Sequence, residues 1–181
     1  MNTLTKLFFN LFAFVVLVTI NAVAQPKCKV EYFSTEHGLS HGTISEILKD
    51  KEGFMWFGTW DGINRFDGRN FASFKSNHGE IAQTGDYRIA QVIEDQLGYL
   101  WIRTFNNQVY RFDKKTKYFL PISPIIEPGV RGRVDIDRII SIKNGMVWLQ
   151  SRVYGIYCLK QNNVTKENVM KFGSGNLGLM S

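Results

Sequence analysis

An all-β fold made of repeated four-stranded sheets is predicted by three observations. First, glycine, tryptophan and isoleucine recur at intervals of 45 and 47 residues: Gly53, Gly98 and Gly145; Trp56, Trp101 and Trp148; Ile44, Ile89 and Ile136. Second, turn signals separate short apolar runs inside each repeat. Third, residues 25–181 show no sustained helical period. Four antiparallel strands in every ~45 residues are the signature of a β-propeller blade.

Residues 1–24 have the features of a secretory signal peptide. Lys6 precedes an apolar stretch that continues through LFAFVVLVTI, and Ala22-Val23-Ala24 offers a small-x-small cleavage site. We therefore expect cleavage after Ala24 and export from the cytoplasm. An uncleaved membrane anchor is the alternative, but the apolar stretch is shorter than the ~20 residues that a spanning helix needs. Cleavage would lower the net charge from +6 to about +5 and leave the length of one domain.

The first repeat predicts four strands joined by tight turns. ISEILKD alternates imperfectly, Lys51-Glu52-Gly53 supplies a turn, and FMWFGT follows as the second strand. Trp60-Asp61-Gly62 then turns the chain into INRFD. Asp67-Gly68 is a hairpin signal because these residue types tolerate positive φ, and it leads into NFASFK as the fourth strand.

The second and third repeats follow the first with increasing divergence. DKEGFMWFGTWDGINRFD at 50–67 corresponds to DQLGYLWIRTFNNQVYRFD at 95–113 and to KNGMVWLQSRVYGIYCLK at 143–160. We place the repeats at about 38–82, 83–130 and 131–177, with the start of a fourth at 178–181. Three blades cannot close a ring, since propellers use about four to eight. We therefore expect an N-terminal fragment or a truncated gene product that is poorly stable alone.

The recurring residues are expected to serve the scaffold. Blades stack face to face, so the three tryptophans should fill the wedge between neighbouring sheets. The three glycines should occupy turn positions with positive φ. Asp50 and Asp95 hold the same place before the turn, which favours caps of the hairpin backbone over a paired acid and base.

Candidate binding residues lie in the loops between the second and third strands and between blades, which share one rim of a propeller. Aromatic faces beside amides, carboxylates and guanidinium groups suit sugar recognition, because sugar rings stack on aromatics and their hydroxyls need paired donors and acceptors. The interblade loops include His37, His41, Asp86, Tyr87, Arg88, Arg131 and Arg133. The predicted ligand-binding residues are Trp60, Asp61, Arg88, Arg103, Phe105, Asn106, Arg152 and Tyr154. For each one, a turn residue or a rim salt bridge is the alternative.

Catalysis, metal binding and cofactor binding find no support in these residues. His37 and His41 are four apart, but Gly38 and the loop context remove the helical geometry of a metal pair. The positive charge is scattered, which favours a solvated surface over a nucleic-acid interface. Cys28 and Cys158 would meet an oxidising compartment, and whether they pair is left open.

The residues resemble a known family. GLSHGTISEILKDKEGFMWFGTWDGINRFDG at 38–68 is similar to the propeller repeat in the sensor region of two-component regulators, particularly the hybrid systems of Bacteroidetes. The likeness is good in IAQVIEDQLGYLWIRTFNNQVYRFD and weakens in the third repeat, where Ile142-Lys143-Asn144 replaces the acidic turn and Ser151 stands for threonine. It covers about residues 31–160 and implies part of a seven-bladed propeller.

The resemblance also implies a larger parent protein. Such proteins usually carry a periplasmic region of two propellers and an immunoglobulin-like domain, then a membrane helix and cytoplasmic histidine kinase, receiver and DNA-binding modules. We therefore expect a periplasmic sensor fragment, without enzymatic activity of its own, of a kinase anchored in the inner membrane that detects an oligosaccharide. Its partners would be the remaining blades and signalling modules, and a homodimer of the parent is left open. A secreted propeller scaffold that binds proteins is the alternative, and a propeller lyase or glycosidase is the third.

Overall fold

The structure is a computed structural model that describes residues 2–20, 29–76, 87–127 and 134–173. The chain divides into two compact units, residues 1–32 and residues 33–181. The first unit contains α1 (Thr3–Ile20). Among the described residues no helix has both the length and the apolar character to cross a membrane. The expected cleavage site after Ala24 lies outside the described residues, as does Cys28.

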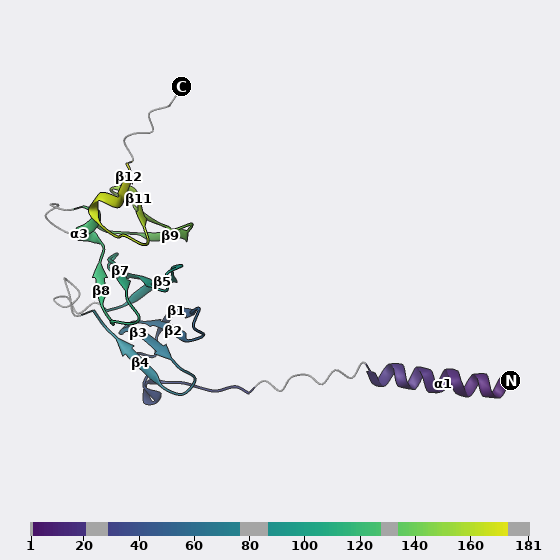
Figure 1. The fold of residues 1–181 in the computed structure, drawn as a ribbon. Coiled ribbons are helices and arrows are strands. Elements are labelled where there is room, and N and C mark those ends of the chain that lie inside the picture. The colour runs from purple at the N-terminus through teal and green to yellow at the C-terminus, as the bar shows by residue number, and fades with distance from the viewer. Residues whose placement is uncertain (1, 21–28, 77–86, 128–133, 174–181) are drawn as a thin grey trace, which may run out of the picture. The chain divides into compact units, whose positions relative to one another are not determined.

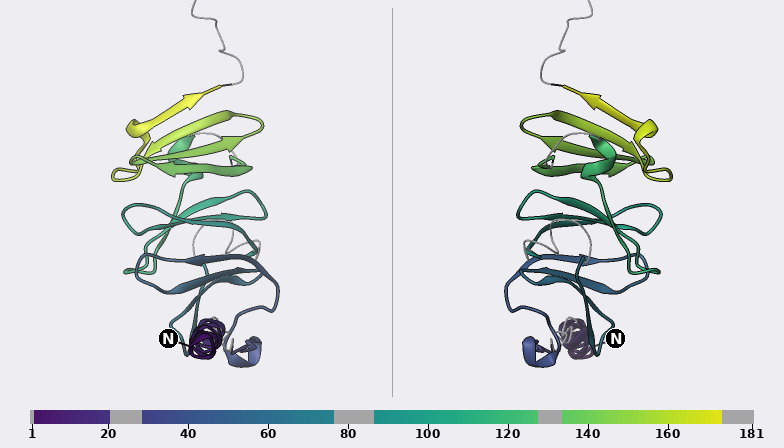
Figure 2. Two further views of the ribbon diagram at one scale, coloured as in Figure 1. Left: turned by 90° about the vertical axis from the view of Figure 1, so that its right-hand side faces the viewer. Right: turned by 90° about the vertical axis from the view of Figure 1, so that its left-hand side faces the viewer.

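Three four-stranded antiparallel sheets build the second unit, and they are arranged in chain order (Figures 1 and 2). The first contains β1 (Ile44–Lys49), β2 (Met55–Thr59), β3 (Gly62–Phe66) and β4 (Phe71–Phe74). The second contains β5 (Ile89–Glu94), β6 (Leu100–Thr104), β7 (Val109–Phe112) and β8 (Phe119–Pro121). The third contains β9 (Arg138–Lys143), β10 (Met146–Ser151), β11 (Gly155–Lys160) and β12 (Val169–Phe172). The predicted all-β fold of four-stranded blades is confirmed, and we call the sheets blades 1, 2 and 3.

Short helical turns lie outside the sheets. They are η1 (Thr35–His37) before blade 1, α3 (Ser123–Ile126) after blade 2, and η2 (Lys166–Asn168) inside blade 3. The side chain of Ser34 accepts a hydrogen bond from the backbone N–H of Glu36, and His37 Nδ1 accepts one from the backbone N–H of Ser34. His37 therefore caps a helical turn.

The aspartate before the first turn fixes that turn within each of blades 1 and 2. Asp50 Oδ1 accepts hydrogen bonds from the backbone N–H groups of Glu52 and Phe54, while Oδ2 accepts one from Trp56 Nε1 at 2.7 Å. Asp95 repeats the pattern with Leu97, Tyr99 and Trp101. The predicted role of both aspartates as backbone caps is confirmed. The bond to the indole adds a contact that the sequence pattern did not indicate.

Blade 3 replaces that turn with a tighter one. Lys143 pairs with Met146, so Asn144 and Gly145 form a two-residue hairpin loop with φ of 53° and 74°. Positive φ at both positions is the requirement of a type I′ turn, which asparagine and glycine tolerate best. No aspartate is needed, because a two-residue loop leaves fewer backbone N–H groups to cap.

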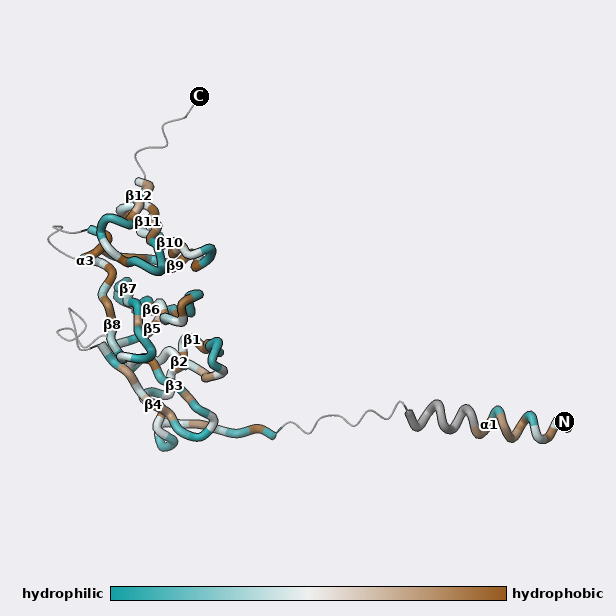
Figure 3. The backbone as a smooth tube through the Cα atoms, viewed as in Figure 1, coloured by the Kyte–Doolittle hydropathy of each residue, from teal (hydrophilic) through white to brown (hydrophobic). Residues whose placement is uncertain are grey.

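Two apolar clusters fill the spaces between blades. Trp56 is buried with Phe112 between blades 1 and 2, and Trp101 is buried with Leu149 and Tyr157 between blades 2 and 3. In Figure 3 hydrophobic colouring lies mainly on the strands and hydrophilic colouring on many of the turns. The two tryptophans thus occupy the predicted wedge positions.

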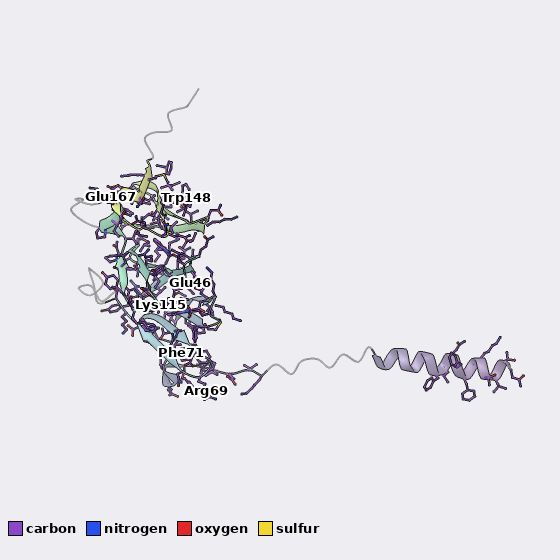
Figure 4. All side chains as sticks on the ribbon, in the orientation of Figure 1. Glu46, Arg69, Phe71, Lys115, Trp148 and Glu167 are labelled. Atoms are coloured by element: carbon purple, nitrogen blue, oxygen red, sulfur yellow. The ribbon has the colours of Figure 1, made fainter. Side chains whose placement is uncertain are left out.

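Trp148 lies in a different environment from its two counterparts. Its side chain is half-buried and stacks on Phe172 of the same sheet, with ring centroids 5.8 Å apart. Figure 4 labels Trp148 on the third sheet. Among the described residues no further blade faces it. Cys158, opposite Trp148 in the strand register, is fully buried, and burial raises the pKa of its thiol.

Glycine in the second strand of blade 1 permits a close approach to blade 2. A Cβ placed on Gly58 would lie 2.8 Å from Ile89 Cγ2 and 3.2 Å from Glu46 Cβ. Any other residue at this position would require Ile89 or Glu46 to shift. The strand register gives Arg103 and Gln150 as the equivalent residues of blades 2 and 3.

An ionic cluster joins blades 1 and 2. Lys114 Nζ lies 3.0 Å from Asp50 Oδ2 and 2.9 Å from Glu94 Oε1. Burial lowers the pKa of Lys114, but hydrogen bonds to Glu94, Asp50 and Glu52 outweigh it and raise that pKa to about 12. Lys51 adds a hydrogen bond from its ammonium to the backbone oxygen of Asp95 at 2.7 Å.

Blades 2 and 3 are joined by neutral and charge-assisted hydrogen bonds. Gln91 exchanges two with the backbone of Ile139, both 3.0 Å long, and the guanidinium of Arg111 donates to the backbone oxygen of Gln161. The two junctions therefore use different chemistry.

Loss of the Asp95 carboxylate should destabilise the fold more than loss of an exposed turn carboxylate. Asp95→Ala leaves a buried indole N–H and two backbone N–H groups without their acceptor, so we expect the free energy of unfolding to fall by about 2–4 kcal/mol. Asp67→Ala is the matched control, because Asp67 accepts from two backbone N–H groups at an exposed turn. Urea denaturation measures both, and equal losses would contradict the role of the indole bond.

Replacement of Lys114 should lower stability in a pH-dependent way. Lys114→Gln leaves two buried carboxylates without their cation, so we expect a loss of about 3 kcal/mol in the free energy of unfolding near pH 8. Because the folded-state pKa of about 12 lies above the ordinary 10.5, the cluster contributes fully below pH 10.5 and is lost as pH rises through 12. The difference from the unmodified protein should shrink between pH 10.5 and 11.5 in denaturation curves. Lys115→Gln at the exposed neighbouring position should change little at any pH.

Candidate functional site

The loops between second and third strands lie on one edge of the three blades, which we call the loop rim. Consecutive antiparallel strands place these loops beside the segments that precede β1, β5 and β9. Trp60 N donates to the backbone oxygen of Thr43, and Phe105 N donates to that of Arg88. In blade 3 the backbone N–H of Arg152 donates to Asp137 Oδ2 at 2.6 Å. Each blade thus contributes a similar pair of segments to the rim.

Blade 1 presents an indole and an imidazole. Trp60 is 45% exposed, and its ring stacks on that of His41 with centroids 5.8 Å apart and an interplanar angle of 26°. Asp61, the neighbouring residue, forms an ion pair with Lys75 at 2.7 Å. A carboxylate held by a lysine remains an acceptor for a hydroxyl group beside the exposed aromatic face.

Blade 2 presents a phenyl ring and a guanidinium. Phe105 is 48% exposed, and the guanidinium carbon of Arg88 lies 5.7 Å from its ring centroid. This is a cation–π contact at an exposed site, a geometry worth about 0.5–1 kcal/mol. Arg88 itself is exposed.

Two other predicted residues of blade 2 are engaged by the protein. Arg103 is half-buried and donates to Asn107 Oδ1 at 3.1 Å, and burial lowers the pKa of its guanidinium. Asn106 Oδ1 accepts a hydrogen bond from the hydroxyl of Thr104. Asn107 adopts a φ of 62°, as a tight turn requires. Both Arg103 and Asn106 therefore help to shape the loop.

Blade 3 contributes a charged tip. Arg152 is 85% exposed along its side chain, and its Nε lies 3.3 Å from Asp137 Oδ1. Tyr154 is half-buried and packs against the apolar cluster between blades 2 and 3, with Lys171 Nζ 5.3 Å from its ring centroid. Tyr154 is thus mainly a packing residue, whereas Arg152 faces solvent.

The structure therefore separates the predicted residues into two groups. Trp60, Asp61, Arg88, Phe105 and Arg152 lie on the loop rim with accessible groups, whereas Arg103, Asn106 and Tyr154 are largely used inside the protein. Asp86, Arg131 and Arg133 lie outside the described residues. Whether the first group binds a ligand stays a prediction.

Sequence reasoning missed three partners of the rim residues. Lys75 pairs with Asp61, Asp137 pairs with Arg152, and His41, which the sequence indicates only as a loop residue, stacks on Trp60. The position of His41 and Asp137 relative to the predicted strands could have indicated both of them. His41 and Asp137 each lie within three residues of the start of a blade's first strand, where antiparallel pairing brings them opposite the loop.

The chemistry available on the loop rim is non-covalent recognition. The exposed ring of Trp60 lies beside an imidazole, and that of Phe105 lies beside a guanidinium. The rim also carries two carboxylates: Asp61, which follows Trp60 in the sequence, and Asp137, which pairs with Arg152. Across the described residues no group of three or more His, Cys, Asp and Glu side chains could hold a metal ion.

Comparisons with known proteins connect this fold to signalling proteins. Residues 38–61 match the family model of the two component regulator propeller. A stretch of 45 residues is 42% identical to Histidine kinase P4 of Formosa agariphila and covers 25% of this chain and 3% of that protein.

Two solved structures share the fold. The extracellular domain of the putative hybrid two component system BT3049 from B. thetaiotaomicron matches with a TM-score of 0.61 and 22% identity over 81% of this chain and 20% of that one. The corresponding domain of BT4673 matches with a TM-score of 0.51 and 22% identity over 67% and 17%. The chain spans a fifth or less of the length of these relatives.

The resemblance expected from residues 38–68 is confirmed by these matches. The three four-stranded sheets give the described part of the chain the fold of these extracellular domains. Residues 38–61 are similar to the two component regulator propeller repeat, which is the part of the chain that the family model covers.

Proposed function

We propose that this chain is part of the periplasmic sensor region of a hybrid two-component histidine kinase, and that its loop rim binds an oligosaccharide. The chain would reach the periplasm through an N-terminal signal peptide, and the parent would be anchored in the inner membrane. Ligand binding outside would then alter kinase activity inside. The residues present would bind and transmit, while catalysis would belong to the parent's kinase module.

One observation carries the proposal for the ligand class. Trp60 and Phe105 expose aromatic faces on the same edge of neighbouring blades, and each lies against a nitrogen-bearing side chain from the preceding segment. The contacts with His41 and Arg88 limit ring rotation, which reduces the entropy lost when a sugar stacks on the face. The adjacent donors and acceptors are of the type that sugar hydroxyls need.

The electrostatics of the rim support a ligand that is neutral or weakly acidic. Both carboxylates, Asp61 and Asp137, are paired with cations. A cationic ligand would therefore have to compete with Lys75 and Arg152 for these carboxylates. Hydroxyl or carboxylate oxygens of a ligand could accept hydrogen bonds from the guanidinium of Arg152, whose side chain is 85% exposed.

Trp60→Ala should weaken oligosaccharide binding to the periplasmic region of the intact receptor. Loss of the indole face removes the stacking surface, so we expect the Kd to rise at least about tenfold, or about 1.4 kcal/mol. Calorimetric titration with a panel of neutral and acidic hexasaccharides measures the affinity. Circular dichroism and thermal melting check that the fold is retained.

Tyr118→Ala is the matched control for that experiment. Tyr118 is also 45% exposed but lies in the turn between β7 and β8, at the opposite edge of the blades. Its replacement should leave the affinity unchanged. An unchanged affinity in Trp60→Ala, or an equal loss in both variants, would remove the loop rim as the binding surface.

A further inference from the structure

Among the described residues, the opposite edge of the blades has a cleft at each of the two junctions, at equivalent places. We call this edge the turn rim, because it carries the turns that come after the first and third strand of every blade. The cleft between blades 1 and 2 is lined by Glu52, Leu97, Tyr99, Lys114 and other turn residues and has a volume of about 100 Å³. The cleft between blades 2 and 3 has a volume of about 460 Å³.

Ionic contacts close the first cleft. Lys114 reaches from blade 2 to Asp50 in blade 1, and the backbone N–H of Lys51 donates to Glu94 Oε2 at 2.9 Å. These contacts hold the turns of blades 1 and 2 together at the junction that buries Trp56.

One substitution and one shortened turn distinguish the second cleft from the first. The strand register aligns Lys114 with Gln161, because Trp101 pairs with Arg111 and Trp148 pairs with Cys158. The amide nitrogen of Gln161 donates within its own blade, to Met146, whereas the ammonium of Lys114 reaches across to the neighbouring blade. The first turn of blade 3 is also the shortened Asn144-Gly145 loop, which reaches less far than its counterparts.

Gln161 offers a buried acceptor at the wall of this cleft. It is 1% exposed, its backbone N–H donates to the oxygen of Gly145 at 2.9 Å, and its Nε2 donates to the oxygen of Met146 at 3.4 Å. Its Oε1 has no hydrogen-bond partner among the described residues. A buried carbonyl oxygen without a donor is unfavourable, and a ligand hydroxyl would satisfy it once the side chain turns toward the cleft.

We propose that the cleft between blades 2 and 3 binds a sugar residue of a neutral saccharide, as a second site separate from the loop rim. The volume falls within the range of roughly 300–1,000 Å³ that small-ligand sites span. The side chains that would contact the sugar are Gln96, Leu97, Asn144, Met146, Gln161 and Asn162.

The lining selects this class of ligand by its chemistry. Four amide side chains supply both donors and acceptors, which matches hydroxyl groups that do both. Leu97 and Met146 supply apolar contact for the C–H groups of a sugar ring. Lys160 is the charged residue among the described lining residues, so the cleft lacks the carboxylate that a cationic ligand would need.

Gln161→Lys should close the cleft and abolish binding there. A lysine at this position can reach Asp95 in the way that Lys114 reaches Asp50, so we expect the midpoint of thermal unfolding to rise while the cleft is filled. The measurement is ¹H–¹⁵N NMR of the full chain during titration with maltohexaose, cellohexaose and mannohexaose. At least one probe should shift the side-chain amide signals of Gln96, Gln161 and Asn162, and Gln161→Lys should raise its Kd at least tenfold.

Further variants keep the test independent of folding and of the loop rim. Asn162→Ala changes an exposed lining residue and should raise the Kd at least threefold with no change in thermal unfolding. Trp60→Ala, on the other edge, should leave these amide shifts intact. The proposal is overturned if none of the three probes shifts the amide signals, if a folded Gln161→Lys or Asn162→Ala variant binds as before, or if Trp60→Ala removes the shifts.

Discussion

The bond between a turn carboxylate and a buried indole is the constraint on which the rest of this structure depends. In blades 1 and 2, Asp50 and Asp95 each bind two backbone N–H groups with one oxygen and a tryptophan with the other. The side chain that fills the wedge between blades is thereby fixed to the turn at the blade's edge. Packing of the core and position of the turn rim are set by the same group.

Blade 3 lacks that carboxylate and differs from the other two blades in both respects. Its hairpin is closed by two residues with positive φ, its tryptophan stacks on Phe172, and Gln161 stands where blade 2 has Lys114. The ionic cluster that closes one junction thus has a neutral counterpart at the next. The residues in which the third repeat diverges from the first two therefore give blade 3 a different surface, with a larger cleft lined by amide side chains.

Much of the fold could be predicted from the sequence because it depends on local signals. The turns at Gly53 and Gly98 and the burial of Trp56 and Trp101 all depend on residue type and spacing. The tight turn expected at Asp67-Gly68 is instead a four-residue loop, because Phe66 pairs with Phe71 and Gly68 has positive φ while Asp67 does not. The cluster around Lys114 could not be predicted, since its contact with Asp50 joins residues 64 positions apart. The contacts of the loop rim could not be predicted for the same reason. Strand order sets which edge each loop occupies, whereas the stacking of His41 on Trp60 depends on how two segments meet in space.

The glycine of β2 has a consequence for how far the repeats are interchangeable. Gly58 lets Ile89 approach to a distance that no side chain would permit, while the same register position holds Arg103 in blade 2 and Gln150 in blade 3. A copy of blade 2 in the place of blade 1 would put the Cβ of an arginine against Ile89 of β5. The blades are therefore fitted to their neighbours pair by pair, and duplication, deletion or shuffling of a single unit would require compensating changes in the unit beside it.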